Sequence, residues 1–161
     1  MSPRDRTVEQ ELARLATEQH GVVTRSELLR VGIGVAQIKR RVRLGTLLRE
    51  HPGVYRVGHR APSVEARYLA AVRACGPGAL LSGRAAGYLL GLLKGTPPQP
   101  EVTAPTERRV RGVRTRRRRR LEAADATSVR GIPVTTVPQT VVDLAAVLPL
   151  AGLALQGFQP R

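Results

Sequence analysis

Aromatic residues are almost missing from this chain of 161 residues, which has no Trp, one Phe and three Tyr. Its cores must therefore be built from Leu, Val, Ile and Ala. A single cysteine, Cys75, excludes an intramolecular disulfide, and its place on an apolar helical stripe predicts core packing. No apolar run approaches the roughly 20 residues that span a bilayer, and the start of the chain leads into an amphipathic helix. We expect a soluble, cytoplasmic protein without membrane contact.

Patterns for catalysis or metal binding are missing as well. His20, His51 and His59 are scattered, and no second cysteine accompanies them at metal-ligand spacing. No glycine-rich motif of the kind that cradles phosphates is present. Asp143 is a lone acid among apolar residues, which is more typical of a surface or capping group than of a general base. The sequence predicts no metal, no cofactor and no enzymatic activity.

Negative charge is scarce. The chain has 27 Lys and Arg against 12 Asp and Glu, a net charge of +15. Residues 1–60 carry 12 basic and 6 acidic side chains (+6), and residues 61–161 carry 15 and 6 (+9). Such a field raises the local concentration of a polyanion, although arginine abundance in a chain rich in Ala, Gly and Val is also typical of codon bias. Composition favours a nucleic-acid partner without proving one.

Residues 7–60 have the element order of a winged helix-turn-helix. Apolar spacing predicts a first helix over residues 8–19. The next helix starts at a capping box of Thr24 and Glu27, with Val23 and Leu28 placed as a hydrophobic staple.

A basic third helix follows after Gly32, beginning near Gly34 and ending at Gly45. Two short strands, 47–49 and 54–57, then form a hairpin that would serve as the wing. These elements predict a DNA-binding domain.

The third helix is expected to bury Val35, Ile38 and Val42, which turns Gln37 and Arg40 outward. A Gln can pair bidentately with adenine and an Arg with guanine, so these two are the predicted base readers. The other cations, with smaller weight on the wing and on His59 and Arg60 beyond it, are expected to hold phosphates. A solvated amphipathic face is the alternative. The candidate DNA-binding residues are Thr24, Arg25, Gln37, Lys39, Arg40, Arg41, Arg43, Arg49 and Arg56.

Residues 61–149 are predicted to form a second, small mixed α/β domain, which makes the whole chain α+β. Helices are expected over residues 64–75, 83–93 and 137–148, and strands over 101–104, 112–118, 128–130 and 132–135. The remaining residues, 150–161, are expected to form a frayed tail.

Nine arginines lie between residues 108 and 120. Alternation along a strand would send Arg116, Arg118 and Arg120 to one face and Arg117 and Arg119 to the other, so the strand should lie at a sheet edge. Nucleic-acid contact, an acidic partner protein and a solvated edge are equally open. The candidate residues of this cluster are Arg114, Arg116, Arg117, Arg118, Arg119 and Arg120.

Short motifs spread over residues 8–149 resemble the AbiE-type (AbiEi family) abortive-infection antitoxins of type IV toxin–antitoxin systems. The matching segments are residues 21–28, 38–42, 53–55, 80–82, 84–86, 131–136 and 143–145. The resemblance implies a winged-helix domain that binds double-stranded operator DNA and represses its own operon. Winged-helix repressors often pair to read two half-sites, so a homodimer on DNA is the expected form. The resemblance also implies an α/β domain that counters a nucleotidyltransferase-like toxin.

Many chains of this family continue into an endonuclease-like domain, and this sequence is expected to be truncated before it, so nuclease activity is not implied. Two other functions stay open. One is a DNA-recognition remnant of a very-short-patch-repair-like endonuclease that lacks its catalytic domain. The other is a basic protein-interaction module.

Overall fold

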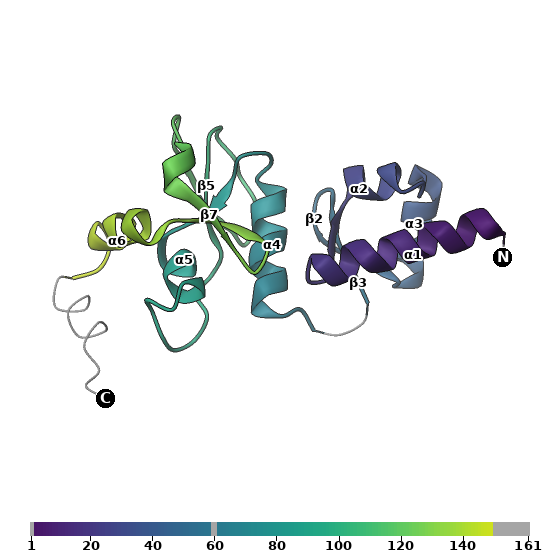
Figure 1. Cartoon of the computed structure of the whole chain (residues 1–161), viewed down its shortest axis with the longest axis horizontal. Coiled ribbons are helices and arrows are strands. Elements are labelled where there is room, and N and C mark those ends of the chain that lie inside the picture. Colours follow the sequence, from purple (N-terminus) through teal and green to yellow (C-terminus); the bar gives the residue numbers. More distant parts are fainter. Residues whose placement is uncertain (1, 59–60, 150–161) are drawn as a thin grey trace. The chain divides into compact units, whose positions relative to one another are not determined.

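The structure, a computed structural model, describes residues 2–58 and 61–149. The chain divides into two compact units, the first ending at Ala74 and the second beginning at Cys75. Each unit combines helices with a β-sheet (Figure 1), which confirms the predicted α+β class. The fraying predicted for residues 150–161 concerns a segment outside the described residues.

The first unit is built on a three-stranded antiparallel sheet of order β1-β3-β2. Strand β1 was not predicted, because three residues directly before a helix cap show no readable alternation. It pairs with β3, where Val23 lies opposite Tyr55. In chain order the elements are α1 (Pro3–Glu18), β1 (Val22–Thr24), α2 (Arg25–Arg30), α3 (Val35–Leu44), β2 (Leu47–His51), β3 (Val54–Val57) and α4 (Val64–Ala74).

Local signals fix both ends of α2. The Thr24 N–H donates to Glu27 Oε2 (2.8 Å) and the Glu27 N–H donates to Thr24 Oγ1 (3.2 Å), so the predicted capping box is confirmed. Just beyond the helix, Gly32 adopts φ +99°, a conformation that side chains disfavour. The chain can therefore turn sharply into α3.

An apolar cluster joins α1, α2 and α3 to the sheet of the first unit. Ile38 is its only fully buried contribution from α3, with 4% of its surface exposed. Val35 was predicted to be buried as well, and this is wrong: it is 42% exposed, because it lies in the first turn of α3 beside an open groove. The buried members of the cluster are Leu12, Val23, Leu28, Ile33, Ile38, Leu47 and Tyr55.

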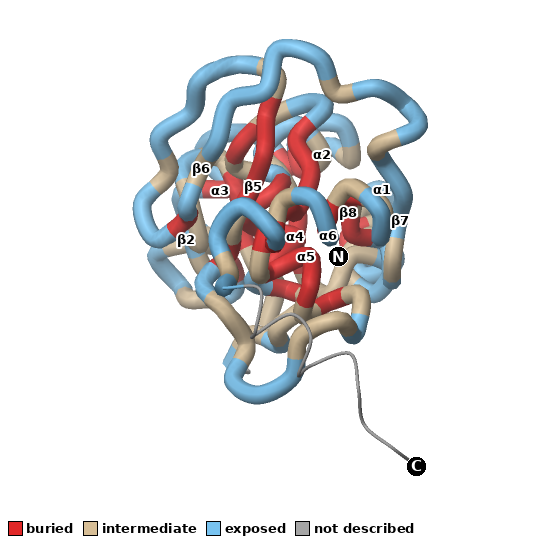
Figure 2. The backbone as a smooth tube through the Cα atoms, turned by 90° about the vertical axis from the view of Figure 1, so that its left-hand side faces the viewer, coloured by how far each residue is buried: buried red, intermediate tan, exposed pale blue. Residues whose placement is uncertain are grey.

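The second unit contains a five-stranded mixed sheet of order β6-β5-β4-β8-β7. Pairs β4–β5 and β7–β8 are antiparallel, whereas β4–β8 and β5–β6 are parallel. Figure 2 shows β5 and α5 largely as buried segments. The elements are β4 (Leu80–Leu81), α5 (Gly83–Leu89), β5 (Glu101–Ala104), β6 (Arg114–Arg117), a 3-10 turn (Ala123–Asp125), β7 (Ala126–Val129), β8 (Ile132–Thr135) and α6 (Val137–Ala145).

Several predicted elements of the second unit are shorter in the structure. The helix expected to reach residue 93 ends at Leu89, and Gly91 then takes φ +78°. The helix expected to reach residue 148 ends at Ala145. The arginine-bearing strand covers only four residues, Arg114–Arg117, at the sheet edge where its charge pattern placed it.

The capping box offers a direct test of local folding. We expect Thr24→Ala to lower the free energy of unfolding by about 1 kcal/mol, because the Glu27 N–H loses its acceptor. Thr24→Ser keeps a hydroxyl at this position and should cost much less. Urea unfolding followed by circular dichroism measures both. Equal losses in the two variants would contradict a stabilising role for the hydroxyl.

Candidate nucleic-acid interface

The outward side of α3 carries unpaired positive charge. Ile38 faces the core, and at about 100° per residue Arg40 then lies on the opposite side of the helix. Lys39, Arg40 and Arg43 are exposed. No carboxylate of the described residues forms an ion pair with any of the three. These cations are therefore available to an anionic partner.

Arg41 is placed differently. Its guanidinium forms an ion pair with the carboxylate of Glu9 on α1, and its side chain is only 26% exposed. Since the two residues are 32 positions apart in sequence, the pair ties α1 to α3. Arg41 thus supports the placement of α3, and its charge is already partly neutralised.

Arg56, on β3, is similarly engaged. Its Nε donates to Glu50 Oε1 at 2.7 Å, and only 11% of its side chain is exposed. The pair crosses from β2 to β3 and braces the hairpin. Among the candidate cations of the hairpin, Arg49 is the exposed one.

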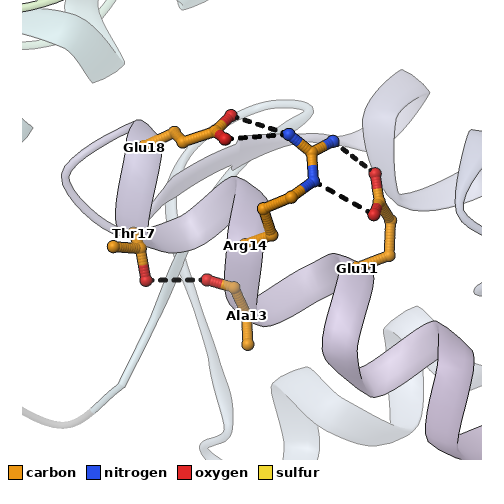
Figure 3. Close-up of polar contacts among 5 residues, drawn as sticks. All are labelled: Glu11, Ala13, Arg14, Thr17 and Glu18. Atoms are coloured by element: carbon orange, nitrogen blue, oxygen red, sulfur yellow. Dashed lines mark hydrogen bonds and ion pairs between the residues drawn. The ribbon is translucent and has the colours of Figure 1, made fainter.

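Charge on α1 is also balanced within the helix. Arg14 lies between two carboxylates (Figure 3): its Nε donates to Glu11 and its Nη1 to Glu18, at 3.1 and 2.8 Å. The hydrogen bond from Arg14 lowers the pKa of Glu11, with a smaller contribution from its charge. Arg14 is therefore partly neutralised by its own helix, unlike the exposed cations of α3.

A groove of about 480 Å³ runs between α3 and the β2–β3 hairpin. Apolar side chains form much of its lining, and three cations, Arg25, Lys39 and Arg49, stand along it. The groove is lined by Arg25, Val35, Ile38, Lys39, Val42, Arg49, Pro52, Gly53 and Tyr55. Cationic side chains beside an apolar groove suit a partner that presents phosphate groups together with apolar surface.

One backbone hydrogen bond joins the start of α2 to the hairpin turn beside this groove. The N–H of Arg25, the first residue of α2, donates to the carbonyl of Gly53 at 2.9 Å. Gly53 occupies the hairpin turn with φ +75°. Because Thr24 caps the same helix end, the capping box and the hairpin turn together place Arg25 at the groove. The Thr24 hydroxyl accepts the capping hydrogen bond from the Glu27 N–H at this helix end.

Two features of α3 were not foreseen. Leu44 is 60% exposed, on the same side of α3 as Arg40. The side-chain oxygen of Gln37 accepts a hydrogen bond from the Gly34 N–H at 3.3 Å. A glutamine three positions after the cap residue of a helix is a sequence pattern that predicts this contact. His59 and Arg60, predicted as further phosphate contacts, lie outside the described residues.

The arginine cluster of the second unit lies on and beside the edge strand β6. The side chains of Arg114, Arg116 and Arg117 are exposed on this strand. Arg118 approaches Asp125 at 3.7 Å, and the following residues, Arg119 and Arg120, are exposed beyond the strand. The alternation predicted through residue 120 is wrong past Arg117, because the strand ends there. The cluster forms a local cationic surface of the second unit.

A small pocket of about 140 Å³ lies at the start of α5. Its lining includes the carboxylates of Glu101 and Asp143 and the guanidinium-bearing Arg114 and Arg116. Gln139 Nε2 donates to Asp143 Oδ1 at 2.9 Å, as expected for a helix-surface acid. Within the described parts of the chain, no three His, Cys, Asp or Glu residues come together as a metal site.

Comparison with known proteins supports the resemblance seen in the sequence. Residues 10–58 match the family model described as "Transcriptional regulator, AbiEi antitoxin", which confirms the predicted likeness over that segment. The match covers α3 and the hairpin and ends with the first described segment. No curated protein matches the chain. Among the helices of the described residues, none is long and apolar enough to cross a membrane.

Half-buried His51, at the end of β2, is expected to make the stability of the first unit depend on pH. Burial lowers the pKa of His51 from its ordinary value of 6.5, against a smaller opposing effect of Glu50. The unfolded chain then binds more protons than the folded one, so stability should fall as pH drops below about 6.5 toward the lowered pKa. We expect His51→Gln to flatten this dependence in urea unfolding between pH 7 and 5. An unchanged slope would assign the pH dependence to other groups.

Proposed function

We propose that this chain is a DNA-binding transcriptional regulator of the AbiEi antitoxin type that represses its own operon. The observation that carries the proposal is the set of unpaired cations on the outward side of α3, Lys39, Arg40 and Arg43. They lie within the segment that matches this family of regulators. A helix that presents cations and a glutamine to solvent has the side chains that read a major groove.

The elements around α3 support a winged helix-turn-helix. Helices α2 and α3 are joined by a tight turn at Gly32, and the β2–β3 hairpin follows α3 directly. In a winged helix-turn-helix, the second helix of the motif, here α3, would enter the major groove of DNA. The hairpin would lie over the adjoining DNA backbone. The bond from Arg25 to Gly53 would hold the hairpin at a fixed distance from the helices.

This arrangement divides the work among the cations. Arg40 points farthest from the core and is the proposed reader of guanine, through O6 and N7. Lys39 and Arg43 flank it and would hold phosphates, as would Arg25 and Arg49 along the groove. Arg41 and Arg56 would act mainly through their ion pairs, by fixing α3 and the hairpin.

The second unit is proposed to counter a nucleotidyltransferase-like toxin, on the resemblance of its motifs to AbiE-type antitoxins. Operator binding by a homodimer would let two copies of α3 read two half-sites. We place this regulator in the cytoplasm, where its operator and toxin would be found, and assign it no catalytic step.

Arg40 tests the proposed reading helix. We expect Arg40→Ala to weaken binding to the palindrome upstream of the chain's own coding sequence by about 1 to 3 kcal/mol and to relax specificity there. Arg6→Ala removes an equal charge from an exposed position on α1 and should have a smaller effect without relaxing specificity. Fluorescence anisotropy with labelled duplexes measures both. Unchanged binding by Arg40→Ala would exclude α3 as the reader.

The arginine cluster is proposed as a second, sequence-independent contact with DNA. Replacing Arg116, Arg117, Arg119 and Arg120 with Gln should weaken specific and random duplexes alike. The slope of log K against log salt should become shallower by up to about 4 units, since each lost phosphate contact removes about 0.9. Arg118→Gln is a useful comparison, because this arginine already approaches Asp125. An unchanged slope would assign the cluster to a protein partner or to solvent.

A further inference from the structure

The pocket of about 140 Å³ at the start of α5 brings opposite charges together without pairing them. Glu101 on β5 and Arg114 on β6 are register partners, so their side chains leave the same face of the sheet. Arg116 lies on that face two positions along β6, and Asp143 comes from α6. Within the described residues, none of these four side chains forms an ion pair. Both signs of charge are therefore open to a ligand.

Ser82 adds an unmet hydrogen-bond donor to the wall of the same pocket. It is the cap residue of α5, yet its side chain makes no capping hydrogen bond, and only 5% of its surface is exposed. Its Oγ accepts a hydrogen bond from Thr103 Oγ1 at 2.8 Å. In the part of the chain that the structure describes, the Ser82 O–H itself has no acceptor. Buried hydroxyl donors nearly always have one, and the pocket is the space from which an acceptor can reach this group.

The glycine at position 83 allows the Glu101 carboxylate to lie at this pocket. Gly83, the first residue of α5, has φ +58°, and a Cβ built on it would overlap Glu101 Oε2. A side chain at this position would therefore displace the carboxylate.

We propose that this pocket binds a small zwitterion, a free α-amino acid. Its ammonium group would lie between Glu101 and Asp143, and its carboxylate would accept from Arg114 and the Ser82 hydroxyl. Two carboxylates and two guanidiniums sum to zero net charge, so a ligand with one sign of charge would leave the opposite pair unmet. The pocket is smaller than the roughly 300–1,000 Å³ of sites for drug-sized ligands, which favours a ligand of few non-hydrogen atoms.

The charges of the ligand can be tested one at a time on the full chain. A thermal-shift screen of the proteinogenic L-amino acids, each up to about 10 mM, identifies those that bind, because a ligand of the folded state raises its melting temperature. The best of them is then compared by isothermal titration calorimetry with its amide, which keeps only the ammonium group, and with its N-acetyl derivative, which keeps only the carboxylate. We expect both derivatives to bind at least about tenfold more weakly.

Matched substitutions test the two charged ends of the pocket. Arg114→Gln and Glu101→Gln should each weaken the amino acid at least about tenfold, since each removes a charge-assisted hydrogen bond. Arg111→Gln and Glu107→Gln remove the same charges from exposed positions outside the pocket lining, and their affinities should stay within about twofold of the wild type. Circular dichroism confirms that each variant is folded before the titration.

A pair of glycine variants tests the place of the Glu101 carboxylate independently. Gly83→Ala puts a methyl group where the carboxylate lies, and we expect it to weaken binding as Glu101→Gln does. Gly91→Ala introduces a side chain at a similarly positive φ of +78°, where no atom lies within 4 Å of the added Cβ. It should bind as the wild type does.

Four results would overturn the inference. They are the absence of any shift with the amino acids, equal binding of the amide or the N-acetyl derivative, wild-type affinity in both Arg114→Gln and Glu101→Gln, and tighter binding of Mg²⁺ or inorganic phosphate alone. Equal affinity of Gly83→Ala and Gly91→Ala would also contradict it. None of these measurements involves DNA, so the proposed function stands or falls separately.

Discussion

The burial of Ile38 determines which side of α3 meets solvent. This side chain is 4% exposed and packs with Leu28 and Ile33 in the cluster that joins the helices to the sheet. A rotation of α3 by one residue would bring Lys39 or Gln37 into that apolar site, and burying such a group without partners costs several kcal/mol. The same contact that stabilises the first unit therefore also aims Arg40 outward.

The parts of the fold that could be predicted from the sequence are those that depend on short-range patterns. The capping box of Thr24 and Glu27 needs only residues three positions apart, and the turn at Gly32 depends on one residue's conformational freedom. Strands 101–104 and 132–135 also have the predicted bounds, since turn residues flank both. These signals are legible because their physical causes lie within a few residues of chain.

Contacts between residues far apart in the sequence could not be predicted from such patterns. Arg41 and Arg43 are equivalent by composition and spacing, yet Glu9 holds one of them and leaves the other free. The two-residue strand β4 exists only because β5 and β8 pair with it on either side. Val35 matched the inward spacing of α3, but it lies at the open groove, where 42% of its surface is exposed. Sequence alone thus identifies a cationic helix, and the tertiary structure separates the cations that brace it from those available to a partner.

The arginines of β6 also affect the self-association of the protein through the edge of the second unit's sheet. An edge strand exposes a row of backbone donors and acceptors that another strand could join, which is a common route to aggregation. On β6, guanidinium groups occupy three of four positions, so two such edges would bring like charges together. That repulsion weakens as salt screens it, since the Debye length shrinks from about 10 Å at 0.1 M to about 3 Å at 1 M. Colloidal stability of the protein should thus depend on ionic strength in part through this edge.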